Sequence, residues 1–195
     1  MANCKQETIK GYNAYVDALR KSPSMRMTLV QFDSAGIDTV QAAVPIKDAI
    51  RLDDDNYIPR ALTPLYDAVG ATIENTKKKA KECDVLFVTL TDGLENASTN
   101  WSYEKIQHAI TECEANGWAF AHIGVGANGW AAGQSMYAGT QSIGNVLRTD
   151  GKNIARSMAR AGGQAVHYAS VTGLAKSALK VDFFAGKKDD TLDED

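Results

Sequence analysis

The stretch Val85-Leu-Phe-Val-Thr-Leu-Thr-Asp-Gly-Leu-Glu-Asn-Ala-Ser98 decides the fold of this 195-residue chain. Its first six residues are almost all apolar, which is typical of a strand whose two faces are both covered by helices. The polar segment Thr91-Asp-Gly93 follows at once and indicates a sharp turn at the carboxyl end of that strand. The stretch therefore predicts a parallel sheet with helices on both sides.

Upstream of this strand, the sequence predicts a helix, a hairpin and a second helix. Apolar residues at helical spacing predict a helix from about Lys5 to Arg20. Met27–Phe32 is expected to form a strand, with Thr39–Val44 as its antiparallel neighbour across a short turn. After an irregular loop over residues 47–62, Thr63-Pro64 has the chemistry of a helix start, with threonine as the cap.

Downstream of it, strands and helices continue to alternate. Ser102 is expected to cap a helix that ends at Gly117, and Trp118–Ile123 is expected to form the next strand. The remaining expected elements are a short helix around Ala131, a strand over Asn145–Arg148 and a helix over Ile154–Ala161. This order predicts an α/β fold with a doubly wound, mostly parallel sheet.

The composition excludes several classes of protein. Hydrophobic residues make up 44% of the chain, as in globular domains, and a net charge of −3 argues against a nucleic-acid binder. No apolar stretch approaches the ~20 residues needed to cross a bilayer. Three well-separated cysteines (Cys4, Cys83 and Cys113) suit a reducing compartment. We expect a cytoplasmic protein that binds neither nucleic acid nor membrane.

A single domain is expected over residues 1–188, because no linker or internal repeat divides the chain. Residues 189–195 contain five acidic side chains and no basic one. A run of like charges at a terminus is typical of a solvated, mobile tail, and this is the structure expected there.

Two residues suit a cation site at the carboxyl end of the sheet, where folds of this class usually bind ligands. Asp92 directly follows a buried strand, and a carboxylate there suits a hard cation such as Mg²⁺. Its alternative role is to end the strand and cap the next turn. The Thr63 hydroxyl is a second candidate ligand, with the helix N-cap as its alternative role. The residues alone leave both choices open.

A glycine-rich turn points to a different kind of site. Gly124-Val-Gly-Ala-Asn-Gly129 matches G-x-G-x-x-G after a strand, and Asp150 ends the next strand, as in dinucleotide-binding folds. The pattern lies late in the chain and more glycines interrupt the following helix, so simple tight-turn glycines are the other interpretation. The alternative function is therefore a nucleotide- or dinucleotide-binding enzyme. No nucleophile elbow, phosphate loop or metal-spaced histidine pair indicates catalysis, so we expect no enzyme.

Four blocks of the sequence together resemble the von Willebrand factor A domain, and more narrowly its compact bacterial and phage branch. They are Met27–Ser34, Tyr57–Gly70, Val85–Ser98 and Gly117–Gly124. The similarity covers residue 1 to about residue 165, with the blocks in the family's order and spacing. It implies a doubly wound sheet with helices on both faces.

The resemblance also implies a function. Members of the family typically bind Mg²⁺ at a metal-ion-dependent adhesion site, where a partner's carboxylate fills an open coordination position. The usual role is protein recognition rather than catalysis. The resemblance places the family's metal-site threonine on Thr63 and its metal-site aspartate on Asp92.

The sequence departs from the family at its start. The family's first metal motif, Asp-x-Ser-x-Ser, follows the first and central strand, whereas here Met1 aligns with the methionine that ends this motif. That strand and three oxygen ligands are absent from the sequence given. Either the sequence starts at an internal methionine of a longer protein, or the protein is a naturally shortened member of the family. Two protein oxygens are too few to hold Mg²⁺ firmly. We expect an incomplete or degenerate metal site that binds Mg²⁺ weakly or not at all.

The absent strand leaves the predicted strands Met27–Phe32 and Val85–Leu90 with unpaired edges, which are costly when buried. Three arrangements would relieve this. The two strands pair directly, a late segment (Ala165–Val171 or Leu179–Phe184) inserts between them, or another chain donates a strand.

We expect a protein partner, bound through an acidic side chain or by strand donation, with self-association as a further option. The candidate partner-binding residues lie in loops at the carboxyl ends of the strands: Arg60, Leu62, Asn100, Trp101, Asn128 and Trp130. Tryptophan and arginine are frequent interface anchors. The two tryptophans are equally suited to be lids over the end of the sheet.

Overall fold

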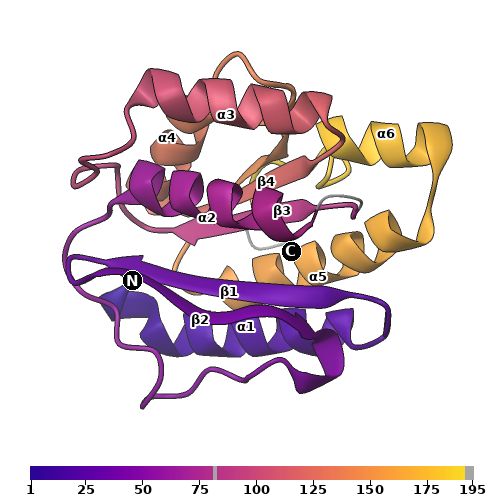
Figure 1. Cartoon of the computed structure of the whole chain (residues 1–195). Coiled ribbons are helices and arrows are strands. Elements are labelled where there is room, and N and C mark those ends of the chain that lie inside the picture. Colours follow the sequence, from indigo (N-terminus) through magenta and orange to yellow (C-terminus); the bar gives the residue numbers. More distant parts are fainter. Residues whose placement is uncertain (81–82, 192–195) are drawn as a thin grey trace.

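The computed structural model describes residues 1–80 and 83–191, in which helices and strands alternate (Figure 1). The helices are α1 (Lys5–Leu19), α2 (Leu65–Lys79), α3 (Tyr103–Ala115), α4 (Gly126–Met136), α5 (Ile154–Ser170) and α6 (Gly173–Val181). The strands are β1 (Arg26–Asp33), β2 (Gly36–Pro45), β3 (Leu86–Thr91), β4 (Ala119–Val125) and β5 (Val146–Thr149). Short 3₁₀ helices cover Ala2–Cys4, Ile46–Asp48 and Gln141–Asn145. The fold is α/β.

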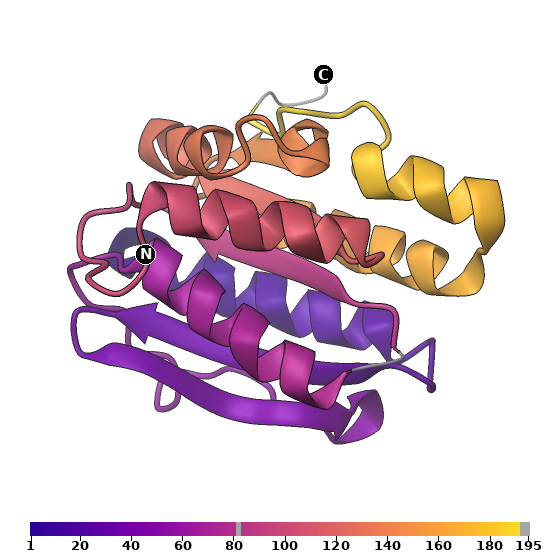
Figure 2. The ribbon, with the colours of Figure 1, turned by 45° about the horizontal axis from the view of Figure 1, so that its top comes forward.

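The strands form two separate sheets. β1 and β2 are an antiparallel hairpin, and β3, β4 and β5 form a parallel sheet in that order. β1 lies between β2 and β3 and runs in the same direction as β3, yet β1 and β3 are not hydrogen-bonded (Figures 1 and 2). The single doubly wound sheet expected from the sequence is therefore interrupted between β1 and β3, and direct pairing of these two strands is a wrong prediction.

Two hydrophobic clusters lie on opposite sides of β4, whose residues are all buried. Ala121 and Ile123 point into the cluster formed with α1 and α5, which pack against each other. Phe120 points the other way, into the cluster formed with α2, α3 and α4. This alternation is that of a strand covered by helices on both faces. It positions the carboxyl ends of β3 and β4 side by side.

The predicted elements as far as β5 are confirmed with boundary changes of a few residues. The Ser102 cap is also confirmed, because its hydroxyl accepts a hydrogen bond from the Lys105 backbone N–H at 3.3 Å. α5 is longer than expected, and α6 was not expected. Ala165–Ser170 lies in α5, and Leu179–Phe184 spans the end of α6 and the following turn. Neither late segment inserts beside β1 or β3, so that prediction is also wrong.

The first residues of the expected solvated tail pack against the rest of the protein. Arg148 of β5 donates its backbone N–H to Lys188 and accepts one from Asp190, both at 2.8 Å. The Asp190 side chain is fully buried and accepts a hydrogen bond from Ser157 at 3.1 Å. Residues 189–191 are thus part of the fold, and residues 192–195 lie outside the described part of the chain.

Candidate functional site

The loop that follows β3 is fixed to the start of α2 by reciprocal hydrogen bonds. The Asn96 side-chain oxygen accepts from the Thr63 backbone N–H at 2.8 Å, and the Asn96 N–H donates to the Thr63 carbonyl at 3.2 Å. The Glu95 carboxylate accepts from the backbone N–H of Tyr66 at 2.8 Å, and the Ser98 hydroxyl accepts from that of Asp67 at 2.9 Å. Glu95 and Ser98 therefore cap α2 from a distant segment.

This arrangement corrects the expected helix start. The N-cap position of α2 is Pro64, and Thr63 makes no side-chain capping bond. The Thr63 hydroxyl instead lies against Gly93, so closely that a Cβ at Gly93 would overlap it. Since Gly93 follows Asp92, the structure brings Thr63 and Asp92 into one region at the carboxyl end of β3, although they are far apart in the sequence.

Asp67 holds the second half of the same loop. Its carboxylate is 7% exposed and accepts backbone N–H bonds from Thr99 at 2.9 Å, Asn100 at 3.0 Å and Trp101 at 2.7 Å. Burial acts to raise the pKa of Asp67, but these backbone bonds outweigh it, and the pKa lies below its ordinary value. Asp67 and Glu95 were not among the residues predicted from the sequence, because the neighbouring residues do not show which distant N–H groups a carboxylate will bind.

Asp92 already has a cationic partner. Its half-exposed carboxylate forms an ion pair with the α-ammonium group of Met1, which lies beside the carboxyl end of β3. Burial lowers the pKa of this amino group.

The residues at this position do not fit a firmly bound Mg²⁺ ion. The carboxylates of Glu95 in the loop and of Asp67 in α2 already accept N–H groups, which leaves the oxygens of Thr63 and Asp92. In the described part of the chain, no three His, Cys, Asp or Glu side chains gather so that they could hold a metal ion. Mg²⁺ usually takes six oxygen ligands. Two protein oxygens leave most positions to water or to a partner.

Three exposed apolar side chains come from segments that approach Asp92 and Gly93. Leu62 is 48% exposed and precedes Thr63, while Leu94 is 46% exposed and follows Gly93. Trp130 is 38% exposed and follows Gly129, where an added Cβ would overlap the Thr91 carbonyl and come close to Asp92. Two loops and the start of α4 thus present one large apolar side chain each. We name Leu62, Asp92, Leu94 and Trp130 the rim.

The other candidate partner-binding residues are more scattered. Asn128 is exposed in the first turn of α4, two residues before Trp130. Asn100 and Trp101 lie over α2, where the Trp101 ring packs so closely on Gly70 that a Cβ there would overlap it. Trp101 is therefore half-buried in the cluster between α2 and α3.

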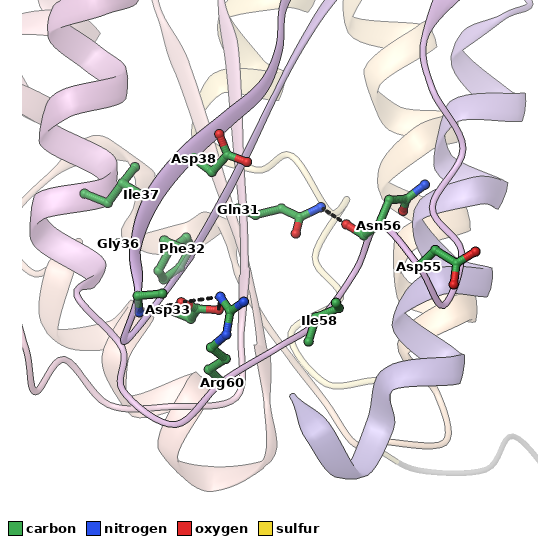
Figure 3. Close-up of a pocket in the computed structure, with 11 residues that line it drawn as sticks. Gln31, Phe32, Asp33, Gly36, Ile37, Asp38, Asp55, Asn56, Ile58 and Arg60 are labelled. Carbon is green, nitrogen blue, oxygen red and sulfur yellow. Dashed lines mark hydrogen bonds and ion pairs between the residues drawn. The ribbon is translucent and has the colours of Figure 1, made fainter.

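Arg60 lies at the end of β1, where its guanidinium group pairs with Asp33 at 3.1 Å (Figure 3). The two residues line an open hollow of about 280 Å³ beneath the turn of the hairpin, together with the acidic Asp38 and Asp55. Because its charge is matched by Asp33, Arg60 is held at this hollow rather than pointing freely into solvent. The sequence-predicted set thus divides between the rim, the surface of α2 and the hairpin.

The glycine-rich turn has clear packing roles. β4 passes directly into α4 between Val125 and Gly126, and Gly126 has a φ of 69°, which favours glycine. Gly129 allows α4 to approach the carbonyl of Thr91, and Gly133 allows it to lie against the buried His122 ring. Asp150 accepts from the backbone N–H of Lys152 and of Asn153 at the start of α5. These contacts account for the residues of the dinucleotide-like pattern without a cofactor.

We expect Gly129→Ala to destabilise the protein by about 2 kcal/mol, because the new Cβ would overlap the Thr91 carbonyl and push α4 away from β3. Gly163→Ala is the matched control. Gly163 is also helical, but nothing lies within 4 Å of the Cβ position, so alanine should stabilise by up to about 1 kcal/mol. Urea unfolding measures both. Equal effects of the two substitutions would contradict the packing role.

Comparison with known proteins finds a likeness among solved structures. No protein-family model and no curated protein matches this sequence. Among solved structures, the chain is similar to proximal thread matrix protein 1 from the mussel byssus, with 15% sequence identity and a TM-score of 0.51. The match covers 79% of this chain and 41% of the mussel chain, so this chain spans less than half of that protein. At this identity, the likeness concerns the fold alone.

Proposed function

We propose that this chain is a non-enzymatic protein-recognition domain of the von Willebrand factor A type, which contacts its partner through the rim. The observation that carries the proposal is the exposure of Leu62, Leu94 and Trp130 on three segments that approach Asp92 and Gly93. Large apolar side chains grouped on a surface often mark an interface, and tryptophan is frequent among residues that dominate binding energy. Leu94 joins the residues expected from the sequence.

The fold supports the family part of this proposal. The mussel protein to which the chain is similar has a von Willebrand factor A-like fold. The helices on both faces of β4 agree with the family's architecture, and the interruption between β1 and β3 lies where its central strand would run. Thr63 and Asp92 also meet at the carboxyl end of the sheet. The same missing strand accounts for the incomplete metal site.

Recognition at such a site relies on apolar contact more than on a metal. Two protein oxygens hold a divalent cation weakly, so an acidic partner side chain gains less from this position than it would from a firmly bound cation. The apolar rim remains available for contact. We therefore place most of the binding energy on Leu62, Leu94 and Trp130.

Site-specific photocrosslinking tests the proposed function. A photoreactive phenylalanine derivative is introduced singly at Leu62, Leu94 and Trp130, and the protein is crosslinked in extracts of its own source. Leu174 of α6, which is 90% exposed, is the matched control position. The proposal expects the same crosslinked protein from all three rim positions and not from Leu174. Crosslinks to that protein from Leu174 as well, or from no rim position, would contradict it.

We also expect Mg²⁺ and Mn²⁺ to bind with a dissociation constant no tighter than about 1 mM, because two protein oxygens cannot replace most of the hydration shell. Isothermal titration calorimetry with each ion measures this. Micromolar binding that is abolished by Asp92→Ala would show that a working metal site exists and would contradict the expectation.

A further inference from the structure

A short segment that follows α6 covers the outer edge of β5. β5 pairs with β4 along its other edge. On the outer edge, the Arg148 backbone N–H donates to the Lys188 carbonyl, and the Arg148 carbonyl accepts from the Asp190 N–H, both at 2.8 Å. Residues 187–191 thus run beside β5 in the parallel direction, like a short added strand (Figure 2). We name residues 187–191 the strap.

The strap contains no apolar side chain. Its sequence is Lys187-Lys-Asp-Asp-Thr191, and of these five residues only Asp190 is buried. The apolar anchoring of this part of the chain ends before the strap begins, at the fully buried Phe183 and Phe184. Burial of apolar surface is the dominant favourable contribution to folding, and the strap lacks it. Charges and hydrogen bonds hold the strap instead.

Asp190 is the side chain that the strap places inside the fold. Its carboxylate accepts a hydrogen bond from the Ser157 hydroxyl of α5 at 3.1 Å, and Ser157 Oγ lies 2.8 Å from Thr149 Oγ1 of β5. Two cationic groups face the carboxylate, Arg160 Nε and Lys187 Nζ, each at 3.4 Å. One buried carboxylate thus joins the strap to both α5 and β5.

The bonds around this carboxylate are incomplete. Within the described residues, Asp190 Oδ1 and Arg160 Nε are buried and have no partner with hydrogen-bond geometry, although each lies in an ion pair. A buried charge that is not fully hydrogen-bonded costs free energy. Desolvation of Asp190 therefore opposes the closed position of the strap, whereas burial of an apolar anchor would favour it.

The other side-chain contacts of the strap lie at the surface. Lys188 pairs with Asp182 at 3.2 Å and donates to the Gly144 carbonyl, while Asp189 lies 3.9 Å from Arg148. The paired side chains are 39–49% exposed. Exposed ion pairs contribute about 1 kcal/mol or less. These contacts therefore add little to the attachment that Asp190 provides.

We infer that the strap is a detachable guard of the β5 edge, held closed by Asp190, which opens while the sheet stays intact. A turn at Ala185 and Gly186, with φ values of 53° and 79°, separates it from the buried Phe184. Proteins commonly cover the edges of their sheets, because an uncovered edge can pair with another chain. Opening converts β5 from a covered strand into an edge strand. This inference goes beyond the proposed function and does not rest on it, because the strap and the rim share no residue.

Hydrogen exchange of the whole protein, followed by NMR at single amides, tests the inference. The Arg148 N–H reports on the strap, whereas the Leu147 and Thr149 N–H groups point to the opposite edge and report on the pairing with β4. We expect the protection factor of the Arg148 amide to be lower than those of both neighbours by about tenfold or more, because the strap opens without the sheet. Equal protection of the three amides would overturn the inference. This measurement needs no substitution.

Asp190→Asn tests the role of the buried carboxylate, with Asp189→Asn as the matched control in the same segment. Asparagine keeps the shape of the side chain but removes the charge that faces Arg160 and Lys187. We expect Asp190→Asn to reduce the protection of the Arg148 amide by about tenfold or more, because it leaves these cations without their buried partner. The amides of Leu147 and Thr149 should change by about threefold or less, as should all three amides in Asp189→Asn. An unchanged Arg148 amide in Asp190→Asn, an equal loss at all three amides or equal effects of the two substitutions would overturn the inference.

Discussion

Asp67→Ala should lower the free energy of unfolding by about 4 kcal/mol at pH 7. The substitution leaves the backbone N–H groups of Thr99, Asn100 and Trp101 without their acceptor in a site where Asp67 is 7% exposed. Each buried N–H group without a partner costs about 1–3 kcal/mol, and water entering the loosened loop recovers part of that. The loop over residues 95–101 should become mobile, and the Trp101 ring should leave Gly70.

Urea unfolding with tryptophan fluorescence measures this change. Asp17→Ala is the matched control, because Asp17 is also helical and pairs with Arg20 and Arg51 on the exposed surface of α1. Exposed ion pairs contribute about 1 kcal/mol or less, so the control should change little. A loss at Asp67 no greater than at Asp17 would show that the carboxylate does not hold the loop.

The second large effect concerns pH. His122 is fully buried between β4 and α4, and burial lowers its pKa from 6.5 to about 4. Its Nε2 lies 3.0 Å from the Gly129 carbonyl, which assigns the proton to Nε2, and Nδ1 has no hydrogen-bond partner. A second proton would therefore create an unpaired buried donor as well as a buried charge.

The sign of the effect follows from linkage. Between pH 6.5 and pH 4 the unfolded chain binds a proton at His122 and the folded chain does not, so stability falls as the pH is lowered through this range. The difference between the two pKa values corresponds to a loss of about 3 kcal/mol in the free energy of unfolding by pH 4. The lowered pKa of Asp67 adds a further loss of stability at the acidic end of this pH range, since the Asp67 carboxylate must be ionised to accept its hydrogen bonds.

Two measurements check this prediction. NMR titration should show that the His122 ring keeps its neutral chemical shifts down to about pH 5, and unfolding at several pH values should show the loss of stability. His122→Gln separates the contribution of His122 from that of Asp67. The variant should be less stable than the original protein at pH 7, but it should lose less stability than the original protein between pH 6.5 and pH 5. An unchanged pH dependence in the variant would contradict the assignment to His122.

Patterns within a few neighbouring residues of the sequence were enough to predict several of the helices and strands. The apolar run of β3, the helical spacing of α1 and the Ser102 cap are properties of a few neighbouring residues, and each was confirmed. α6 was not predicted, although Leu174, Ala178 and Val181 fall at helical spacing in its sequence.

Contacts between distant segments could not be predicted in this way. Thr63 has the sequence signature of a cap, but Glu95 and Ser98 take that role from beyond β3. Asp190 belongs to an acidic run that suggests a solvated tail, yet Arg160 lies 3.4 Å from its carboxylate and Ser157 bonds to it. In each case the partner that decides the outcome is more than 25 residues away, and composition does not reveal it.

β1 and β3 lie side by side in the fold, and their facing edges are not hydrogen-bonded to each other. Amide hydrogen exchange of the protein alone, resolved residue by residue, tests it most directly. We expect β4 to exchange slowly along its whole length and alternate amides of β1 and β3 to exchange much faster than their neighbours. Uniform slow exchange along β1 and β3, equal to that of β4, would mean that the sheet is continuous and would contradict the claim.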